Sequence, residues 1–404
     1  MTGSAGAAKF RARMAPKTAK QLRKAYLSRP PVEPMRLRPG MTVEELVGVY
    51  RKAGAFNGGR LAEACDLFGR MIDSGATIAL TVTGAMTPAG MGGAIQAMIE
   101  AGFVDLIIST GANVYHDLHF ALKLPVVQGH FQVDDKELYR AGIERIYDIF
   151  ITEDSLLDTD AFVREALEKA PKALRGRIST PRLHHYLGQL VRQQAPLPEK
   201  SFVATAAAWD VPIFTSSPGD SSIGMNVAAM KLRGGETTID PDLDVLESTA
   251  IVYDANVNGV VILGGGSPKN FYLQTQPTLW QILDLNRGGH EFVLQISTDS
   301  PQWGGLSGAT PSEAISWGKV QANMLKNHVV LYSDTTVAAP LVFAYALSTR
   351  KKRKPKRLFR RLPEMYAALQ KAHMKKHPGS GAMPEVKDSA KTKTVGPGRA
   401  LPRR

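Results

Sequence analysis

Short apolar runs alternate with amphipathic segments along most of the chain. Such runs occupy residues 77–82, 104–109 and 211–216, and similar stretches follow at 258–270, 291–314 and 328–340. Each run leads through a loop of small residues into a helical pattern. Continuous apolar strands that alternate with helices are typical of a parallel sheet covered on both faces. The pattern therefore predicts an α/β fold, preceded by helices over residues 42–75.

Two further features divide the chain. The segment between residues 120 and 210 is more polar and has a helical pattern, so we expect an extra helical section beside the sheet. Charge then separates a basic N-terminal arm (1–34), a central domain (35–349) and a basic low-complexity C-terminal tail (350–404). The net charge is +13, of which residues 1–30 carry +8 and residues 350–404 carry +15, which leaves −10 for residues 31–349.

The two basic tails have two interpretations. They are expected to be solvated, disordered arms. Alternatively, the run "RKKRKPKRLFRR" (350–361) contacts a nucleic acid or a membrane surface, because a basic run attracts phosphate groups. The N-terminal arm lacks the apolar core of a secretory signal, but it contains arginine and no acid, as transit peptides do.

Composition narrows the class of protein. The chain has 404 residues, 44% hydrophobic and 22% charged, as in globular domains with a substantial core. No apolar run reaches the ~18 residues that span a bilayer, so no membrane segment is expected. Cys65 is the single cysteine, which excludes disulfides within the chain and cysteine-based zinc sites. We therefore expect a reducing, cytoplasmic setting.

Loops rich in glycine, serine and threonine follow the predicted strands, where ligands bind in open parallel sheets. Such loops let backbone N–H groups and helix N-termini approach a phosphate. The dinucleotide fingerprint G-x-G-x-x-G is absent, and "GAMTPAGMGG" is an offset variant. These small-residue loops suit a bound nucleotide, and they equally suit tight turns between strand and helix that bind no ligand. Asp220, Asp299 and Asp334 follow apolar runs, and each suits either a ribose contact or a helix N-cap.

Histidine and lysine supply the remaining candidate chemistry. His116 and His119 share a helical face, but spacing implies no third ligand, so no metal site is predicted. In "ATPSEAISWGK" (309–319), Thr310 and Glu313 suit a capping box at the start of a helix that would include Lys319. That lysine is either solvated or, if desolvated, a nucleophile with a lowered pKa suited to imine chemistry.

Three segments carry a resemblance to a known family. "ILGGGSPKN", "SGATPSEAISWGKV" and "LYSDTTVAAPLV" resemble the deoxyhypusine synthase family, and the similarity extends over roughly residues 40–345. It implies a Rossmann-like, NAD-binding catalytic domain in a homotetramer with active sites at dimer interfaces. It also implies NAD-dependent transfer of the aminobutyl group of spermidine, through an enzyme–lysine imine, to a lysine of a translation factor. The similar homospermidine synthases use putrescine.

Matching the motifs position by position assigns roles to individual residues. The imine-forming lysine falls on Lys319. The resemblance places NAD contacts on Gly84, Ala85, Met86, Thr87, Pro88, Thr110, Gly111, Ala112, His116, Asp220, Gly265, Thr298, Asp299, Asp334 and Thr335. It places polyamine contacts on Tyr115, Met225, Asn270, Gly304, Gly305, Leu306, Glu313 and Trp317.

Several of these positions depart from the eukaryotic pattern. Met225, Leu306 and Asn270 stand where acidic or histidine groups face the polyamine, and Tyr115–His116 replaces an acidic pair. Each lost charge-assisted hydrogen bond costs ~1.5–3 kcal/mol of substrate binding. Such divergence resembles the prokaryotic deoxyhypusine synthase-like branch. The acceptor is then a protein lysine or a free diamine, and a non-catalytic NAD- or polyamine-binding protein is the alternative from another class.

Overall fold

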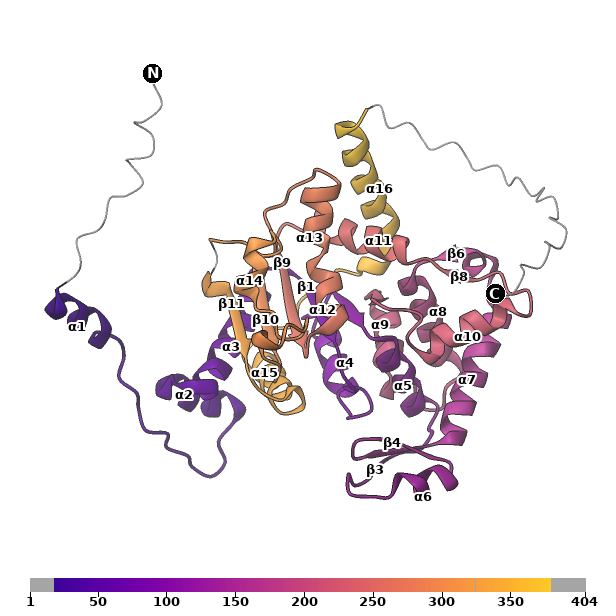
Figure 1. Ribbon diagram of the computed structural model, residues 1–404, viewed down its shortest axis with the longest axis horizontal. Helices are drawn as coiled ribbons and strands as arrows, with labels where there is room; N and C mark the ends of the chain where they lie inside the picture. Colours follow the sequence, from indigo (N-terminus) through magenta and orange to yellow (C-terminus); the bar gives the residue numbers. More distant parts are fainter. Residues whose placement is uncertain (1–17, 324, 379–404) are drawn as a thin grey trace, which may run out of the picture.

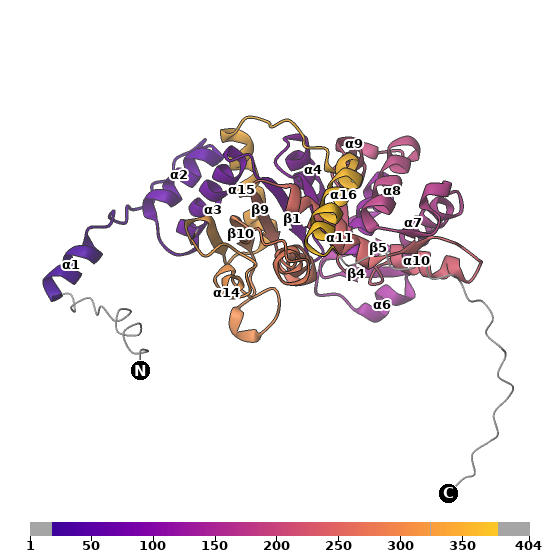
Figure 2. The ribbon, with the colours of Figure 1, turned by 90° about the horizontal axis from the view of Figure 1, so that it is seen from above.

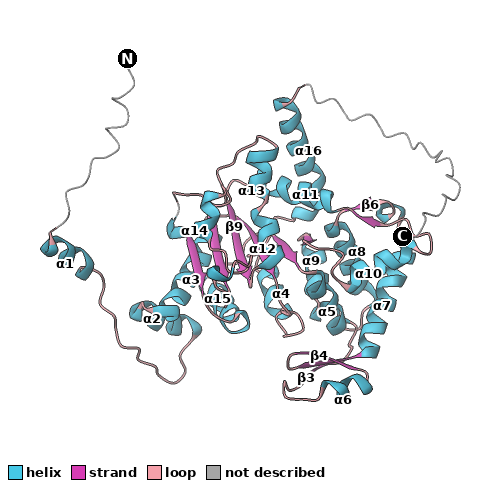
Figure 3. Ribbon diagram, in the orientation of Figure 1, coloured by secondary structure: helices cyan, strands magenta, loops and turns pink. Residues whose placement is uncertain are grey.

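A six-stranded parallel sheet forms the centre of the protein (Figures 1 and 3). The computed structural model describes residues 18–323 and 325–378. The strand order is β11-β10-β9-β1-β2-β7, and every neighbouring pair is parallel. The strands are β1 (Thr77–Val82), β2 (Leu106–Ser109), β7 (Ile213–Thr215), β9 (Asn258–Leu263), β10 (Phe292–Ile296) and β11 (His328–Leu331). All six lie in the predicted apolar runs, which confirms the α/β expectation.

Side chains alternate between the two faces of the sheet along each strand, and each face packs into an apolar cluster. Ile78, Leu80 and Val82 of β1 join one apolar cluster, whereas Ala79 joins a second cluster on the other face. The first face is covered by α3 (Phe56–Asp73), α4 (Gly92–Glu100), α5 (Gly111–Ala121) and α15 (Thr335–Thr349). The second face is covered by α11 (Pro241–Asp254), α12 (Gly266–Leu273) and α16 (Leu358–Lys376).

The strand order reverses in the middle of the sheet. The chain moves outward from β1 through β2 to β7, and then returns to β9, on the other side of β1, before it continues to β10 and β11. This is the Rossmann order 3-2-1-4-5-6 when the strands are renumbered along the chain. The loops after β1 and β9 therefore diverge at the carboxyl edge and leave a crevice there.

The section between residues 120 and 210 is not purely helical, so the expected helical section is incomplete. Its helices are α6 (Asp135–Arg140), α7 (Glu153–Glu168), α8 (Thr180–Gln194) and α9 (Phe202–Trp209). It also holds an antiparallel sheet of β3 (Val126–Gln128), β5 (Ile149–Thr152) and β4 (Ile143–Ile146). The residues of β4 are all half-buried, so these strands lack the continuous apolar run that marks the central ones. One more strand of this section, β6 (Arg177–Ile178), pairs in parallel with β8 (Thr238–Ile239).

The N-terminal part of the chain packs progressively onto the body. Helix α1 (Ala19–Leu27) buries no residue and projects away from the domain (Figures 1 and 2). Helix α2 (Val43–Ala53) packs on α3 and α15, and Thr42 caps it through a capping box with Glu45. Within the described residues, no helix is long and apolar enough to cross a membrane.

The prediction of a disordered tail from residue 350 is wrong for residues 350–376, which we name the C-terminal strap. The strap runs along the body and ends in α16, which packs against α11. Leu358, Leu362, Met365 and Leu369 recur at helical spacing and are at most 3% exposed. Charge dominates the composition of this segment and conceals this apolar stripe. Residues 1–17 and 379–404 of the predicted tails lie outside the described residues.

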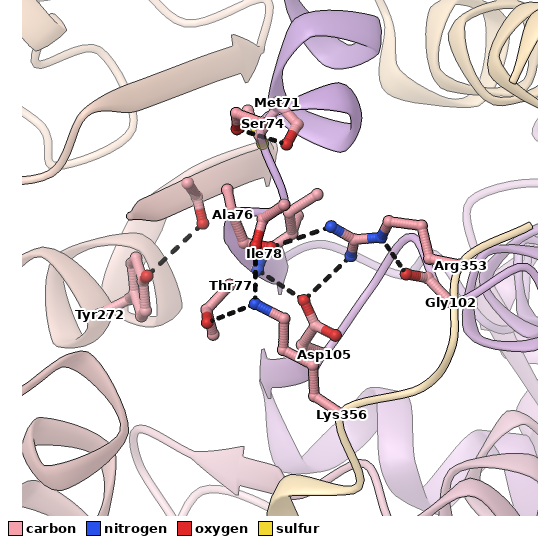
Figure 4. A network of polar contacts seen from close by, with 12 residues as sticks. Met71, Ser74, Ala76, Thr77, Ile78, Gly102, Asp105, Tyr272, Arg353 and Lys356 are labelled. Atoms are coloured by element: carbon pink, nitrogen blue, oxygen red, sulfur yellow. Dashed lines mark hydrogen bonds and ion pairs between the residues drawn. The ribbon is translucent and has the colours of Figure 1, made fainter. Parts of the chain in front are cut away.

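The strap is fastened to the sheet by a buried ion pair (Figure 4). Arg353 donates to Asp105 Oδ2 at 3.1 Å and to the carbonyls of Gly102 and Ala76, at 2.7 and 3.0 Å. Lys356 donates to Thr77 Oγ1 and to the carbonyl of Gly75, both at 2.9 Å.

Three further arginines of the strap pair with acids of the body. Arg357 and Arg360 both contact Asp210, and Arg361 contacts Asp254. Part of the basic run at 350–361 thus neutralises acids of its own domain.

Candidate functional site

A pocket of about 430 Å³ opens at the carboxyl edge of the sheet, where the strand order reverses. Loops after β1, β9, β10 and β11 line it, as expected for a ligand site in an open parallel sheet. Seven predicted cofactor contacts meet there: Gly84, Met86, Gly265, Thr298, Asp299, Asp334 and Thr335. The lining also includes five residues that sequence reasoning missed: Thr83, Gly264, Ser297, Trp303 and Ser307.

Glycine is required at the centre of this lining. Gly265 has φ of +157°, and a Cβ there would lie 2.5 Å from Ser307 Cα. Gly264 has φ of +78°, in the left-handed region that favours glycine. The backbone of this turn is therefore bare, and it opens α12. The N–H of Gly266 donates to Ser307 Oγ at 2.9 Å, which draws the loop after β10 onto the turn.

Two carboxylates border the pocket. Asp334 is the N-cap of α15 and accepts the N–H of Thr336 at 2.8 Å, so one of its oxygens is engaged in capping. Asp299 lies in the loop after β10, and its N–H donates to Ser297 Oγ at 3.1 Å. A bare glycine turn at a helix N-terminus suits a phosphate, and carboxylates at strand ends suit ribose hydroxyls. The residues present therefore fit a dinucleotide.

The other predicted cofactor residues lie outside this lining. Thr87 is buried, and its hydroxyl donates to the Asn113 carbonyl at 2.8 Å; Ala85 and Pro88 flank it in the same loop. Asn113 was not predicted, yet its amide donates to Gly84 O at 2.7 Å and to Thr110 Oγ1 at 2.9 Å. It therefore ties the loop after β1 to the loop after β2.

A second cluster of predicted residues lies toward β7. A Cβ on Gly111 would approach Ser221 Oγ to 2.4 Å, so the start of α5 touches the loop that opens α10 (Ser222–Lys231). Ala112 and Asp220 are exposed on these two segments.

The histidines of α5 are satisfied internally. His116 Nδ1 lies 3.0 Å from His119 Nε2, and His119 Nδ1 lies 2.7 Å from Thr159 Oγ1. Burial lowers the pKa of His116 to about 4 and that of His119 to about 3, so both rings are neutral at physiological pH. In the part of the chain that the structure describes, no group of three His, Cys, Asp or Glu side chains could hold a metal ion.

Lys319 lies just beyond α14 (Pro311–Ser316), not within it as the sequence suggested. Thr310 caps this helix by accepting the Glu313 N–H, and Gly318 ends the segment with φ of +66°. The left-handed glycine redirects the chain, so the predicted helix that includes Lys319 does not form. Gly318 therefore occupies a turn that favours glycine, and it does not destabilise the interior of a helix.

The Lys319 amine is held by an amide and an indole. Its Nζ donates to Asn270 Oδ1 at 2.8 Å and lies 5.7 Å from the centroid of the Trp317 ring. Burial lowers the pKa of Lys319 below its usual value, and the charge of Glu313 partly opposes this shift. The arrangement increases the fraction of neutral amine, the form that attacks a carbonyl or an imine.

Lys269 is the strongest feature that sequence reasoning missed. It lies directly before Asn270 on α12, is 4% exposed, and donates to Leu306 O at 3.0 Å and to Ala309 O. Its position in "GGGSPKN", next to a residue already assigned to the polyamine, was the available signal.

The predicted polyamine residues form two separate groups. Asn270, Gly304, Gly305, Leu306, Glu313 and Trp317 lie with Lys319 on elements after β9 and β10. Tyr115 and Met225 lie on α5 and α10, which follow β2 and β7. Four strand spacings separate β10 from β7, or about 19 Å. Tyr115 is 2% exposed and its hydroxyl donates to Leu156 O and Asp160 Oδ1, whereas Met225 is 59% exposed.

These features define a class: a Rossmann-type α/β fold with a half-buried lysine beside the crevice at the strand ends. The deoxyhypusine synthase family profile matches residues 45–346. A deoxyhypusine synthase-like protein of Nostoc punctiforme is 43% identical over 384 residues, which covers 92% of this chain and 97% of the relative. The chain belongs to the deoxyhypusine synthase family, whose members are transferases.

Two other matches extend the similarity. A "Probable deoxyhypusine synthase 2" of Methanosarcina mazei is 39% identical over 308 residues, which covers 76% of this chain and 86% of the relative. A crystal structure assigned as a deoxyhypusine synthase from Entamoeba histolytica matches with a TM-score of 0.52 and 16% identity. It covers 78% of this chain and 96% of that one, and it supports the fold alone.

Proposed function

We propose that this protein transfers the aminobutyl group of spermidine, or of a related polyamine, to an acceptor amine in an NAD-dependent reaction. The observation that carries the proposal is the state of Lys319. Its amine is half-buried, has a lowered pKa, and donates to Asn270 Oδ1 at 2.8 Å, on the segment that follows the pocket lining. Family membership supports aminobutyl transfer as the reaction type.

The cofactor would be held by the pocket at the strand ends. The glycine turn at Gly264 and Gly265 would face the phosphates, and Asp299 and Asp334 would accept hydrogen bonds from ribose hydroxyls. When bound, NAD supplies a hydride acceptor and later returns the hydride, so the cycle is redox-neutral. After the hydride leaves, the donor carbon is joined to its own nitrogen by a C=N bond, which is an imine.

Residues of this chain then transfer the aminobutyl group. The neutral Lys319 amine attacks the imine carbon, the C–N bond to the propyl part breaks, and 1,3-diaminopropane leaves. Asn270 orients the Lys319 amine, Glu313 pairs with a substrate ammonium, and Trp317 packs on the alkyl chain. The acceptor amine next attacks the Lys319 imine and displaces the lysine. Reduction of the new imine gives a stable secondary amine.

A second copy of the chain would complete the amine site. Met225 follows β7, about 19 Å from β10, the strand that leads to Lys319, and one short amine does not bridge this distance. We therefore propose a homotetramer, in the cytoplasm, in which the exposed Met225 reaches the Lys319 of a neighbouring subunit. The acceptor is a protein lysine of a translation factor or a free diamine. Leu306 and Met225 are apolar and half-exposed or more, and both favour an amine with few charges.

Borohydride trapping tests the proposal. Incubation with NAD and spermidine labelled in the aminobutyl group should place label on Lys319, and the Lys319→Arg variant should take none while it still binds NAD. Added putrescine should move label into a new polyamine if the acceptor is a free diamine, and an added translation factor should be labelled if it is a protein. Absence of label on Lys319 under every condition would refute the transfer and favour a binding protein.

A further inference from the structure

A second lysine, Lys269, is buried beside the reacting one. It is 4% exposed, and both hydrogen-bond acceptors that the structure gives its ammonium are main-chain carbonyls, those of Leu306 and Ala309. A buried ammonium is costly to desolvate, and two carbonyls compensate less well than a carboxylate. An apolar side chain of similar length, such as methionine, would pack here at lower cost. Stability alone therefore does not explain a lysine at this position.

The two carbonyls belong to the turn at residues 306–309, which joins the nucleotide pocket to the amine site. Ser307 of this turn lines the pocket, and α14, with Glu313, begins two residues after Ala309. The turn is held at other points as well. Gly266 N donates to Ser307 Oγ at 2.9 Å, and Gln295 Nε2 donates to Ser307 O at 2.5 Å.

Lys269 and its neighbour act on both sides of α14. Lys269 holds the turn before this helix, and Asn270 accepts the Lys319 ammonium after it. One rigid element, α12, thus sets the positions of both segments. Burial lowers the pKa of Lys269 to about 8, and the nearby charges of Glu313, Lys319 and Asp299 modulate it. At neutral pH Lys269 therefore keeps its positive charge, and this charge and that of Lys319 act on each other.

We propose that Lys269 is a positioning residue, whose ammonium clamps the turn at Leu306–Ala309 and so holds Lys319 in register with the nucleotide pocket. The inference rests on the proposed function only for the identity of Lys319 as the reacting amine. A displacement of about 1 Å at such a site can cost as much as a hundredfold in rate.

The test uses an aldehyde that bypasses both donor and cofactor. Labelled 4-aminobutanal and cyanoborohydride, without NAD, should label Lys319 selectively in the full chain. In Lys269→Met the labelling rate of Lys319 should fall roughly tenfold or more, and its pH midpoint should rise. The midpoint should rise because the neighbouring positive charge is gone and water reaches the loosened site. Lys375→Met, at an exposed position of α16, is the matched control and should behave as the wild type.

Two outcomes would overturn the inference. The first is a folded Lys269→Met variant that labels Lys319 at the wild-type rate and midpoint. The second needs no variant: in the wild type, Lys269 should resist acetic anhydride, and acetylation as fast as that of Lys375 would show that it is not clamped. If spermidine and NAD give no adduct but aldehyde labelling still depends on Lys269, the proposed function fails and the positioning role stands.

Discussion

The ion pair between Arg353 and Asp105 provides the sharpest quantitative prediction. The side chain of Asp105 is 1% exposed and that of Arg353 is 15% exposed. Arg353→Met removes three hydrogen bonds from one guanidinium, to Asp105 and to the carbonyls of Gly102 and Ala76. It also leaves a carboxylate buried without its arginine. Breaking a buried pair on one side costs about 3–5 kcal/mol, which is a large part of the 5–15 kcal/mol typical of a native domain.

An exposed pair on the same strap supplies the matched control. Arg361 and Asp254 lie 2.9 Å apart, but their side chains are 39% and 34% exposed. Arg361→Met should cost at most about 1 kcal/mol, since water and salt screen such a pair. The two variants remove the same kind of side chain from one segment, so the difference reports burial.

Urea denaturation followed by circular dichroism measures both costs, at one protein concentration because assembly shifts the apparent stability. The double variant Asp105→Asn/Arg353→Met should lose less than the sum of its single variants, since the second change removes the uncompensated charge. Equal free energies of unfolding for Arg353→Met and Arg361→Met, or strict additivity in the double variant, would refute the argument.

Three further predictions concern other parts of the molecule. Deletion of residues 350–404 should yield an unfolded or insoluble protein, because the four buried side chains of α16 contribute ~1.5–3 kcal/mol each to stability. Solubility and thermal melting measure this effect. Deletion of residues 379–404, which keeps α16, is the control. Gly318→Ala should reduce borohydride trapping on Lys319, since φ is +66° and the new Cβ would lie 2.7 Å from Trp280 Nε1. His184→Gln should weaken the loss of stability between about pH 6.5 and 4, measured by urea denaturation.

The sign of the His184 effect follows from its burial. Burial lowers its pKa to about 4, while its Nδ1 lies 2.8 Å from Ile213 O. As pH falls from the unfolded value near 6.5, the unfolded chain binds a proton that the folded chain excludes, so stability falls by up to roughly 3 kcal/mol. Burial raises the pKa of Asp117 and Asp244 to about 7, so these two groups increase the stability as the pH falls. Their contribution is the same in the wild type and in His184→Gln. An unchanged difference between variant and wild type across this range would contradict the assignment.

The sequence alone determined the central sheet and the segment that we propose to react. The inner strands β1, β9 and β10 are apolar runs that are buried on both faces, so the hydrophobic pattern of the sequence already reports their burial. The motif "SGATPSEAISWGK" is long enough to predict a role for Lys319 through resemblance. The pocket residues Gly265, Asp299 and Asp334 follow strands directly, and parallel strands bring such positions to one edge.

Only the tertiary structure decided the rest, because the deciding contacts join residues far apart in the chain. Asp105 and Arg353 are separated by 248 positions, and a basic run becomes a docked strap only when its arginines meet acids of the body. Lys269 gains a role because Leu306 and Ala309 fold back onto it. The end of α14 depends on a left-handed Gly318 beside Trp280, which helical spacing does not encode. Local pattern predicts which face is buried, whereas the partner of a buried charge depends on topology.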